Sequence, residues 1–584
     1  MSDARLLPRE RGPWVEGGAL AALVLVLFVV GGVTVRTSYH GYLHTAIGEA
    51  VLRDGLVPEN PWHAGAALRY YVLYPVLAVL TGRLGFGPLW AFALFGVASA
   101  FAFALALDAF GRSLGLSSAA RRFAFLWVLL GLNALGWLWA GGLPDPALRP
   151  AGAGPPLGAA PLQVLAPMAR VGDGFHWDLR LQSFVQKFLN VSSFAPALPF
   201  VLWALAASVW ERGRAPWRSA LHVGVATAIN PLAGGFAGLL VAARFLPELR
   251  GGLAALRRLV PPAACAVAIA LPFVLALLVV PAPEGGASTS DFSLGSAGPW
   301  ADVLGPLILV WPLGVAGLLV IARGDVGFLR SPFLPALGLA LAACFLHLPW
   351  GNQYKFVRLV AILLALPAGV ASARLFAHRR GRPVAVALLL LALPSTWWTL
   401  RAYAAWDAGA VLPLTEVEDG RLAPSPRFEP RFPRAARDAE AALPPEAALL
   451  ADPAMGAETA RMGLVLGHPL APMVHRALLV DQPQVHDRDQ PDLGERLAAW
   501  WVFAHGRTPP QRRGDRGRPA DAGLGLDRLR AKVAGRPLAV YLDESTAPAA
   551  VSALRARGAE ERWRSGSTAL WLLPPWPADD SPGR

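Results

Sequence analysis

The sequence predicts an all-α polytopic membrane bundle of about eleven transmembrane helices, followed by a small C-terminal extracytoplasmic α/β domain. Three observations predict this fold class. Apolar stretches of about twenty residues recur through the first 400 positions, and arginines gather in every second loop. From Arg401 onward the chain becomes charged and rich in proline, with no run long enough to span a bilayer. We therefore expect a transmembrane domain over residues 1–400 and a soluble domain over residues 401–584.

The composition excludes several other classes of protein. Hydrophobic residues make up 54% of the 584 positions and charged residues 16%, whereas soluble domains carry about 25% charged residues. The net charge of +13 lies mostly in short loops between apolar runs, where it sets orientation, so we reject nucleic-acid binding. The first apolar run, Gly17–Val35, is too long for a signal peptide and reads as a retained span. Cys265 and Cys344 both fall inside predicted spans and form neither a disulfide framework nor a metal cluster.

The arginine pattern predicts the orientation of the chain. Six predicted inside segments contain 17 arginines, which places the N-terminus in the cytoplasm of a bacterium, with the protein in the inner membrane. An odd number of spans then puts the C-terminal domain outside. The span count is uncertain by one or two at Tyr70–Thr81 and at the helix break Asn230-Pro231. The predicted outer loops are residues 36–69, 141–192, 282–300 and 350–358.

The C-terminal segment carries the pattern of a small α/β domain. Short apolar runs at Glu446–Asp452, Pro537–Asp543 and Ala569–Leu573 predict buried strands. Pro548–Gly558 predicts a helix, because proline suits its first turn and glycine its end.

The first outer loop holds the first group of candidate residues. His40 and His44 lie four apart and share one face of a helix, where either is a candidate general base or phosphate partner. Two histidines alone are too few ligands to form a metal site, so the sequence identifies no particular metal and the metal stays unknown. Glu49 is a candidate catalytic acid, or it forms a surface ion pair with Arg53 four residues later. An amphipathic helix lying on the membrane surface also explains the pattern without catalysis.

Two further outer segments combine charge with aromatic residues. In the second loop, Asp173, Asp178 and Lys187 suit a site for a sugar phosphate, and a solvated loop with local ion pairs is the alternative. In the last loop, Lys355 and Arg358 stand where the positive-inside rule predicts few cations. They are candidates for binding a lipid phosphate. The alternative is that their long side chains only extend to the lipid headgroups at the membrane surface.

This layout resembles the glycosyltransferase C superfamily, polytopic transferases that use polyprenyl-phosphate sugars. The resemblance covers the whole chain in architecture and few positions in motif. It rests on the cytoplasmic N-terminus, the long second outer loop, the terminal α/β domain, and the run Ala50–Gly55 followed by Leu68–Tyr71. Runs of the type "YY…YP" at Tyr70–Pro75 and "N-x-Y-K-F" at Asn352–Phe356 are similar to those of uncharacterised bacterial membrane proteins.

The chain also departs from the superfamily pattern. The superfamily places an acidic residue just after the first span, and His40-Gly41 stands there in this chain. By loop position, Asp173 or Asp178 matches the second outer acidic residue of the family.

The resemblance implies a transferase that passes a sugar from a polyprenyl-phosphate donor to an extracytoplasmic lipid, glycan or protein, with inversion. His40 or an acid of the first two outer loops would be the base, and four cations would hold the phosphate: Arg69, Lys187, Lys355 and Arg358. The implied partners are membrane lipids, a lipid-linked sugar donor and an acceptor of unknown identity. No cofactor is certain, and a divalent metal is left open. The alternative is a non-catalytic transport or assembly component of cell-envelope biogenesis.

Overall fold

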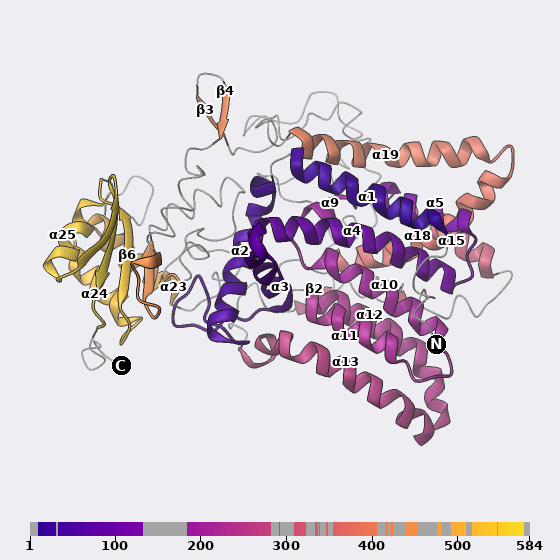
Figure 1. Cartoon of the computed structure of the whole chain (residues 1–584), viewed down its shortest axis with the longest axis horizontal. Coiled ribbons are helices and arrows are strands. Elements are labelled where there is room, and N and C mark those ends of the chain that lie inside the picture. The colour runs from indigo at the N-terminus through magenta and orange to yellow at the C-terminus, as the bar shows by residue number, and fades with distance from the viewer. Residues whose placement is uncertain are drawn as a thin grey trace. The chain divides into compact units, whose positions relative to one another are not determined.

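The computed structural model describes ten longer stretches of the chain and several short pieces (Figure 1). The longer stretches are residues 10–30, 33–131, 184–281, 309–322, 354–405, 440–451, 476–479, 492–509, 517–545 and 547–576. The short pieces are residues 291–292, 333, 335–336, 338, 346–347, 415–418 and 421–424. The chain divides into two compact units. The first comprises Met1–Thr37, Trp90–Val274 and Ser290–Leu412, and the second comprises Ser38–Leu89, Leu275–Thr289 and Pro413–Arg584.

The described part of the first unit is almost entirely helical. In Figure 1, α10, α11 and α12 run lengthwise next to one another. The α-helices are α1 (Arg11–Val30), α4 (Pro88–Ser113), α5 (Ser118–Gly131), α9 (Gln186–Leu189), α10 (Phe194–Trp210), α11 (Trp217–Ile229), α12 (Pro231–Phe245), α13 (Leu253–Val279), α15 (Val310–Ala322), α18 (Tyr354–Ala377) and α19 (Arg382–Ala405). A 3₁₀ turn, Leu246–Gly251, follows α12, and β1 (Asp291–Phe292) pairs with β2 (Leu346–His347).

Five helices of the described residues are long and apolar enough to cross a membrane. They are Arg11–Val30, Pro88–Ser113, Pro231–Gly251, Leu253–Val279 and Arg358–Ala377. Shorter apolar helices are Leu73–Gly85, Phe194–Trp210, Val310–Ile321 and Arg382–Pro394. The predicted bundle of apolar helices is therefore confirmed for the described residues, while the total of about eleven spans, the orientation and the extracytoplasmic place of the C-terminal domain stay predictions.

The predicted helix break at Asn230-Pro231 is confirmed. The Asn230 side chain accepts a hydrogen bond from the backbone N–H of Ala233 (3.0 Å), and its amide nitrogen donates to the Ser193 hydroxyl (2.8 Å). Pro231 then takes the first position of α12, where its missing N–H costs nothing. A Cβ atom on Gly234 would collide with the backbone of Thr227, so α11 and α12 form a tight hairpin.

Small residues let α15 and α18 approach closely, as in many membrane helix pairs. A Cβ atom on Gly317 would collide with the carbonyl group of Pro367. We therefore expect Gly317→Leu to lower the Tm of the detergent-solubilised protein, because overpacking costs about 1–3 kcal/mol. Gly18→Leu is the matched control, since a Cβ atom at this position of α1 would have no neighbouring atom within 4 Å. Equal Tm values for the two variants would contradict close packing at Gly317.

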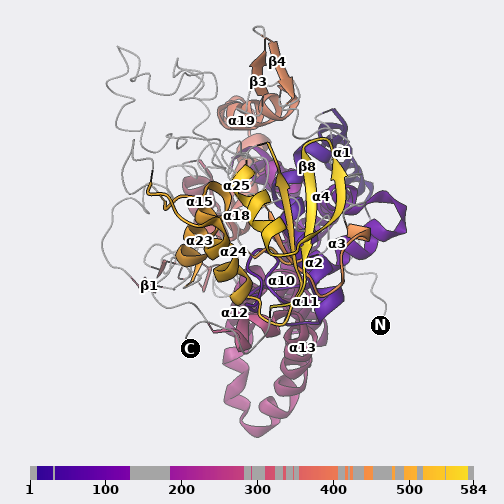
Figure 2. The same ribbon diagram turned by 90° about the vertical axis from the view of Figure 1, so that its left-hand side faces the viewer.

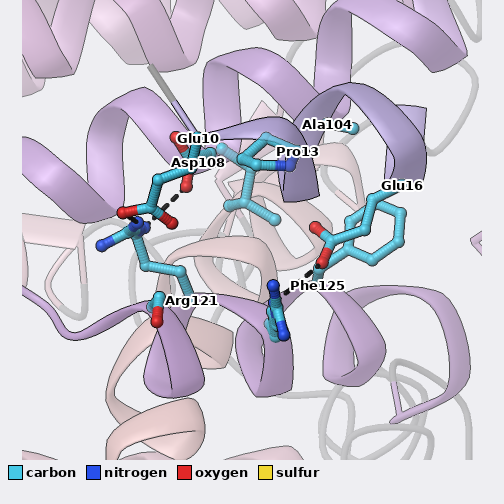
Figure 3. A pocket seen from close by; sticks show the side chains of 10 residues that line it. Glu10, Pro13, Glu16, Ala104, Asp108, Arg121 and Phe125 are labelled. Atoms are coloured by element: carbon cyan, nitrogen blue, oxygen red, sulfur yellow. Dashed lines mark hydrogen bonds and ion pairs between the residues drawn. The ribbon is translucent and has the colours of Figure 1, made fainter. Parts of the chain in front are cut away.

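A network of ion pairs joins two predicted inside segments at one end of this unit. Asp108 accepts hydrogen bonds from Arg112 (2.8 Å) and Arg121 (2.6 Å), and Arg121 also pairs with Glu10 (3.0 Å). Figure 3 shows Glu10 and Asp108 both directed at Arg121. The segment before α1 and the loop between α4 and α5 therefore lie at the same end of the bundle, as the arginine alternation predicts.

The second unit combines two helices from early in the chain with a C-terminal sheet. The early elements are α2 (Val33–Asp54), α3 (Leu73–Thr81) and the π-turn Gly82–Phe86. Gly48 faces the backbone of Pro75 so closely that α2 and α3 pack directly against each other. The later elements are β3 (Thr415–Glu418), β4 (Arg421–Pro424), β5 (Ala448–Ala451), α23 (Leu493–His505), α24 (Ala522–Ala531), β6 (Leu538–Asp543), α25 (Pro548–Ala556), β7 (Glu560–Ser565) and β8 (Thr568–Leu573).

The C-terminal sheet has four strands in the order β5-β6-β8-β7. β5 and β6 are parallel, and the other two pairs are antiparallel. Alternate residues such as Leu538, Val540 and Leu542 turn into a core shared with α23, α24 and α25. Figure 2 shows these three helices gathered on one side of the sheet. The three predicted strands and the predicted helix at Pro548 are confirmed within one or two residues.

The first predicted outer loop extends this sheet beyond β5. Residues 477–479 pair with Leu449 through two backbone hydrogen bonds of 2.9 and 2.7 Å. Leu478 in turn donates to the carbonyl of Pro61 (2.9 Å) and accepts from the N–H of Ala64 (2.7 Å). Ala64 and Trp62 are almost completely buried. The compact unit of the sheet thus includes a loop that the sequence assigns to the transmembrane domain.

Candidate functional site

Three predicted phosphate-binding cations come together in the first unit. Lys187 lies in the short helix α9 and Arg358 in α18, and their exposed fractions are 5% and 7%. Burial lowers the pKa of Lys187 well below its ordinary value, and the positive charges of Arg358 and Lys355 lower this pKa further. The three cations are therefore close enough to repel one another. A bound anion would relieve this repulsion.

A buried amide that sequence reasoning missed is the sequence neighbour of Lys187 in α9. Gln186 is completely buried, and both the oxygen and the nitrogen of its amide lack a hydrogen-bond partner among the described residues. Such a group costs free energy unless a ligand or water satisfies it. No pattern in the sequence marks a lone buried amide. Gln186 offers a donor and an acceptor to a ligand near α9.

Helix amino ends add positive potential to the same region. α10 begins at Phe194 and α12 at Pro231, and their start points are joined by the hydrogen bond between Ser193 and Asn230. The ring of Phe356, in the first turn of α18, lies 6.0 Å from the ring of Phe236 in α12. The amino end of a helix carries a partial positive charge and favours anions. The cations, the amide and the helix ends together form an environment suited to a phosphate group.

The predicted histidine pair belongs to the second unit. The rings of His40 and His44 lie 6.3 Å apart on α2, which confirms that they share a face. His44 is 3% exposed, and its ring lies 5.1 Å from that of Tyr74 and 6.0 Å from that of Tyr70. Tyr70 stacks on Tyr71 at 4.3 Å. The "YY…YP" run and the histidines thus form one cluster.

The remaining candidates have separate surroundings. Glu49 pairs with Arg83 (2.6 Å), and Arg53 pairs with its neighbour Asp54 (2.7 Å). Arg69 is exposed in the second unit, whereas the other three predicted phosphate ligands belong to the first. Asp173 and Asp178 lie outside the described residues. Within the described stretches, no group of three or more His, Cys, Asp or Glu residues could hold a metal ion.

No protein family model matches the chain, and no curated protein matches it. Among solved structures, the chain is similar to apo ArnT from Cupriavidus metallidurans, with 12% identity and a TM-score of 0.47. It is also similar to ArnT from the same organism bound to undecaprenyl phosphate, with 15% identity and a TM-score of 0.45. Each match covers 95% of this chain and 98% of the other.

The first predicted outer loop is fixed at its tip by a charged cluster. His63 is 2% exposed, and its Nε2 lies 2.7 Å from Asp492. Arg496 donates to Asp492 (2.8 Å) and to the carbonyls of Ala64 (2.8 Å) and Leu479 (2.9 Å). Lys532 lies 3.5 Å from Asp492. We call His63, Asp492 and Arg496 the loop clamp.

The loop clamp predicts a dependence of stability on pH. Burial and the positive charge of Arg496 lower the pKa of His63 from 6.5 to about 4, against the opposing effect of Asp492. The folded state binds a proton on His63 more weakly than the unfolded state does. The contribution of neutral His63 to stability is therefore complete above pH 6.5 and is lost as the pH falls toward 4. We expect the free energy of unfolding to fall by about 3 kcal/mol over this window. Urea titration followed by trypsin cleavage at a series of pH values measures the effect.

The control for this pH dependence is His63→Gln, which keeps an N–H donor for Asp492 and does not titrate. Its stability should change less with pH than that of the unmodified chain. Asp492 does not contribute in this window. Burial acts to raise the pKa of Asp492, but the hydrogen bond from Arg496 lowers it, and the resulting pKa lies below 3.8. Parallel pH profiles for the variant and the unmodified chain would refute the assignment to His63.

Proposed function

We propose that this protein is a membrane glycosyltransferase that takes a sugar from a polyprenyl-phosphate donor and passes it to an extracytoplasmic acceptor. The observation that carries the proposal is the cationic cluster of buried Lys187, buried Arg358 and half-buried Lys355, together with the buried and unsatisfied amide of Gln186. Cations buried this deeply are expensive in a membrane protein and commonly mark a binding site. A phosphate that links lipid to sugar matches their charge.

In the proposed reaction, a hydroxyl oxygen of the acceptor attacks the anomeric carbon of the sugar. The bond between that carbon and the phosphate oxygen breaks, and its electron pair remains on the phosphate. The leaving lipid phosphate gains one negative charge, which Lys187, Lys355 and Arg358 stabilise. Attack from the face opposite the leaving group inverts the configuration of the sugar. The positive groups thus act most strongly in the transition state.

The proton of the acceptor hydroxyl requires a base. His40 and His44 are our candidates in the described part of the first outer loop, because Glu49 already pairs with Arg83. A neutral imidazole can take this proton near neutral pH.

Transfer from a synthetic polyprenyl-phosphate sugar in proteoliposomes tests the proposal. We expect radiolabelled sugar to move from the donor to lipid or protein acceptors of a bacterial envelope extract. Lys355→Ala should reduce this transfer at least tenfold. Arg374→Ala is the matched control, because Arg374 is an exposed cation on the same helix α18. It should retain full transfer.

Two results would contradict the proposal. One is the absence of transfer and of donor binding across a panel of polyprenyl-phosphate sugars. The other is equal transfer by Lys355→Ala and Arg374→Ala, which would detach the activity from the cationic cluster.

A further inference from the structure

The second unit contains a cavity that the proposed transfer reaction does not use. Its volume is about 590 Å³, within the range of roughly 300–1,000 Å³ that small-molecule sites occupy. The cavity opens at the carboxyl ends of the parallel strands β5 and β6, where Ala451 and Tyr541 line it. Trp501 of α23 and Ala547 at the start of α25 complete the wall. The carboxyl ends of parallel strands are the usual location of ligand sites in α/β sheets.

The described residues of the cavity wall carry no carboxylate, ammonium or guanidinium group. None of its described residues is Asp, Glu, Lys, Arg, Asn, Gln, Ser or Thr. The polar side-chain groups are those of His505 and Tyr541 and the indole N–H groups of Trp500 and Trp501. A phosphate, a charged peptide or a sugar with several hydroxyls would lose hydrogen bonds to water without replacement. The chemistry of the wall matches a hydrocarbon.

The polar groups of the wall are distributed unevenly. His505 is exposed at the end of α23, and its ring lies 4.3 Å from that of Trp501 and 5.7 Å from that of Trp500. Phe503 and Leu542 are buried and present only apolar surface. A ligand that fits this arrangement has an apolar chain and one polar end, which would lie at His505.

We propose that this cavity binds the hydrocarbon chain of a lipid, with the polar end of that lipid beside His505. The ligand is an acyl or a prenyl chain, since both share the required chemistry. The site is separate from the cationic cluster of the first unit and does not depend on the proposed transferase activity.

Photolabelling of the full chain in phosphatidylcholine nanodiscs tests this proposal. The probes are a diazirine-bearing palmitic acid and a diazirine-bearing farnesol, and peptide mass spectrometry maps the labelled residues. We expect labels in residues 494–505 and 538–550 with at least one probe. A fivefold preference for one probe would assign the chain as acyl or prenyl, and equal labelling would assign a site for either. Absence of label from both segments with both probes would overturn the proposal.

Two variants on α23 separate cavity binding from general lipid contact. Ala498→Trp fills the cavity and should reduce labelling of these segments at least tenfold, whereas Val502→Trp, whose position does not line the cavity, should not. Ala547→Phe provides a second filling variant if Ala498→Trp proves sensitive to trypsin. Lys187→Met should leave labelling unchanged whatever its effect on transfer. Undiminished labelling in folded Ala498→Trp or Ala547→Phe protein would refute the cavity as the site.

Discussion

Lys187→Met is expected to lower kcat/KM for the polyprenyl-phosphate sugar at least a hundredfold. Removal of one preorganised group that stabilises developing charge typically costs a factor of about 10²–10³. The leaving phosphate gains its extra charge only in the transition state, so the loss should appear mainly in kcat. Methionine keeps an unbranched apolar side chain at this almost fully buried position. Steady-state kinetics in proteoliposomes measures both constants.

The stability of Lys187→Met distinguishes a functional loss from misfolding. Because burial and two neighbouring positive charges disfavour the charged form of Lys187, its removal should raise the Tm of the ligand-free protein or leave it unchanged. Lys532→Met is the matched control, since Lys532 lies in the second unit and pairs with Glu495 at 2.7 Å. This control should retain transfer within twofold. If Lys187→Met kept more than half of the activity, Lys187 would not hold the donor phosphate.

Arg496→Ala is expected to destabilise the second unit by about 3–5 kcal/mol, because it breaks a largely buried charge cluster. The guanidinium is 5% exposed and donates to one carboxylate and two backbone carbonyls. Its loss leaves Asp492 and the carbonyls of Ala64 and Leu479 without these donors. Urea titration of the full chain, followed by trypsin cleavage within residues 492–576, measures the change.

Arg528→Ala is the control for this prediction, because Arg528 is exposed on the neighbouring helix α24. Surface substitutions of this kind usually change stability by less than about 0.5 kcal/mol. Identical midpoints for Arg496→Ala and Arg528→Ala would show that the loop clamp does not stabilise the unit.

Local patterns were sufficient to predict several elements of the fold. The apolar runs at β5, β6 and β8 predict strands because all three are buried, and Asn230-Pro231 predicts a helix end from local backbone chemistry. Strand β7 was missed, because its residues Glu560–Ser565 are mostly charged or polar and form the outer edge of the sheet. A charged edge strand has no apolar run to reveal it.

The sequence identified individual residues of the candidate site, but it did not predict which of them lie close together. Lys187 and Lys355 stood out as cations in predicted outer loops, yet their proximity depends on how α9 and α18 pack. Gln186 carries no pattern that marks a lone buried amide. The contact between Arg496 and Ala64 joins residues 432 positions apart, so no local rule predicts it.

The pairing of Pro61–Ala64 with the C-terminal sheet affects how the chain folds and how a C-terminal fragment would behave. The segment Pro61–Ala64 completes one edge of the sheet, although it is synthesised long before the strands of that sheet. More than 400 residues separate it from its partner Leu478, so we expect it to dock onto the sheet slowly during folding. A fragment beginning at residue 440 would expose the backbone of residues 477–479 and the hydrophobic positions covered by Trp62 and Ala64. Open edges of this kind pair with other chains. An isolated C-terminal fragment should therefore self-associate, and a peptide spanning residues 58–68 should restore the monomer.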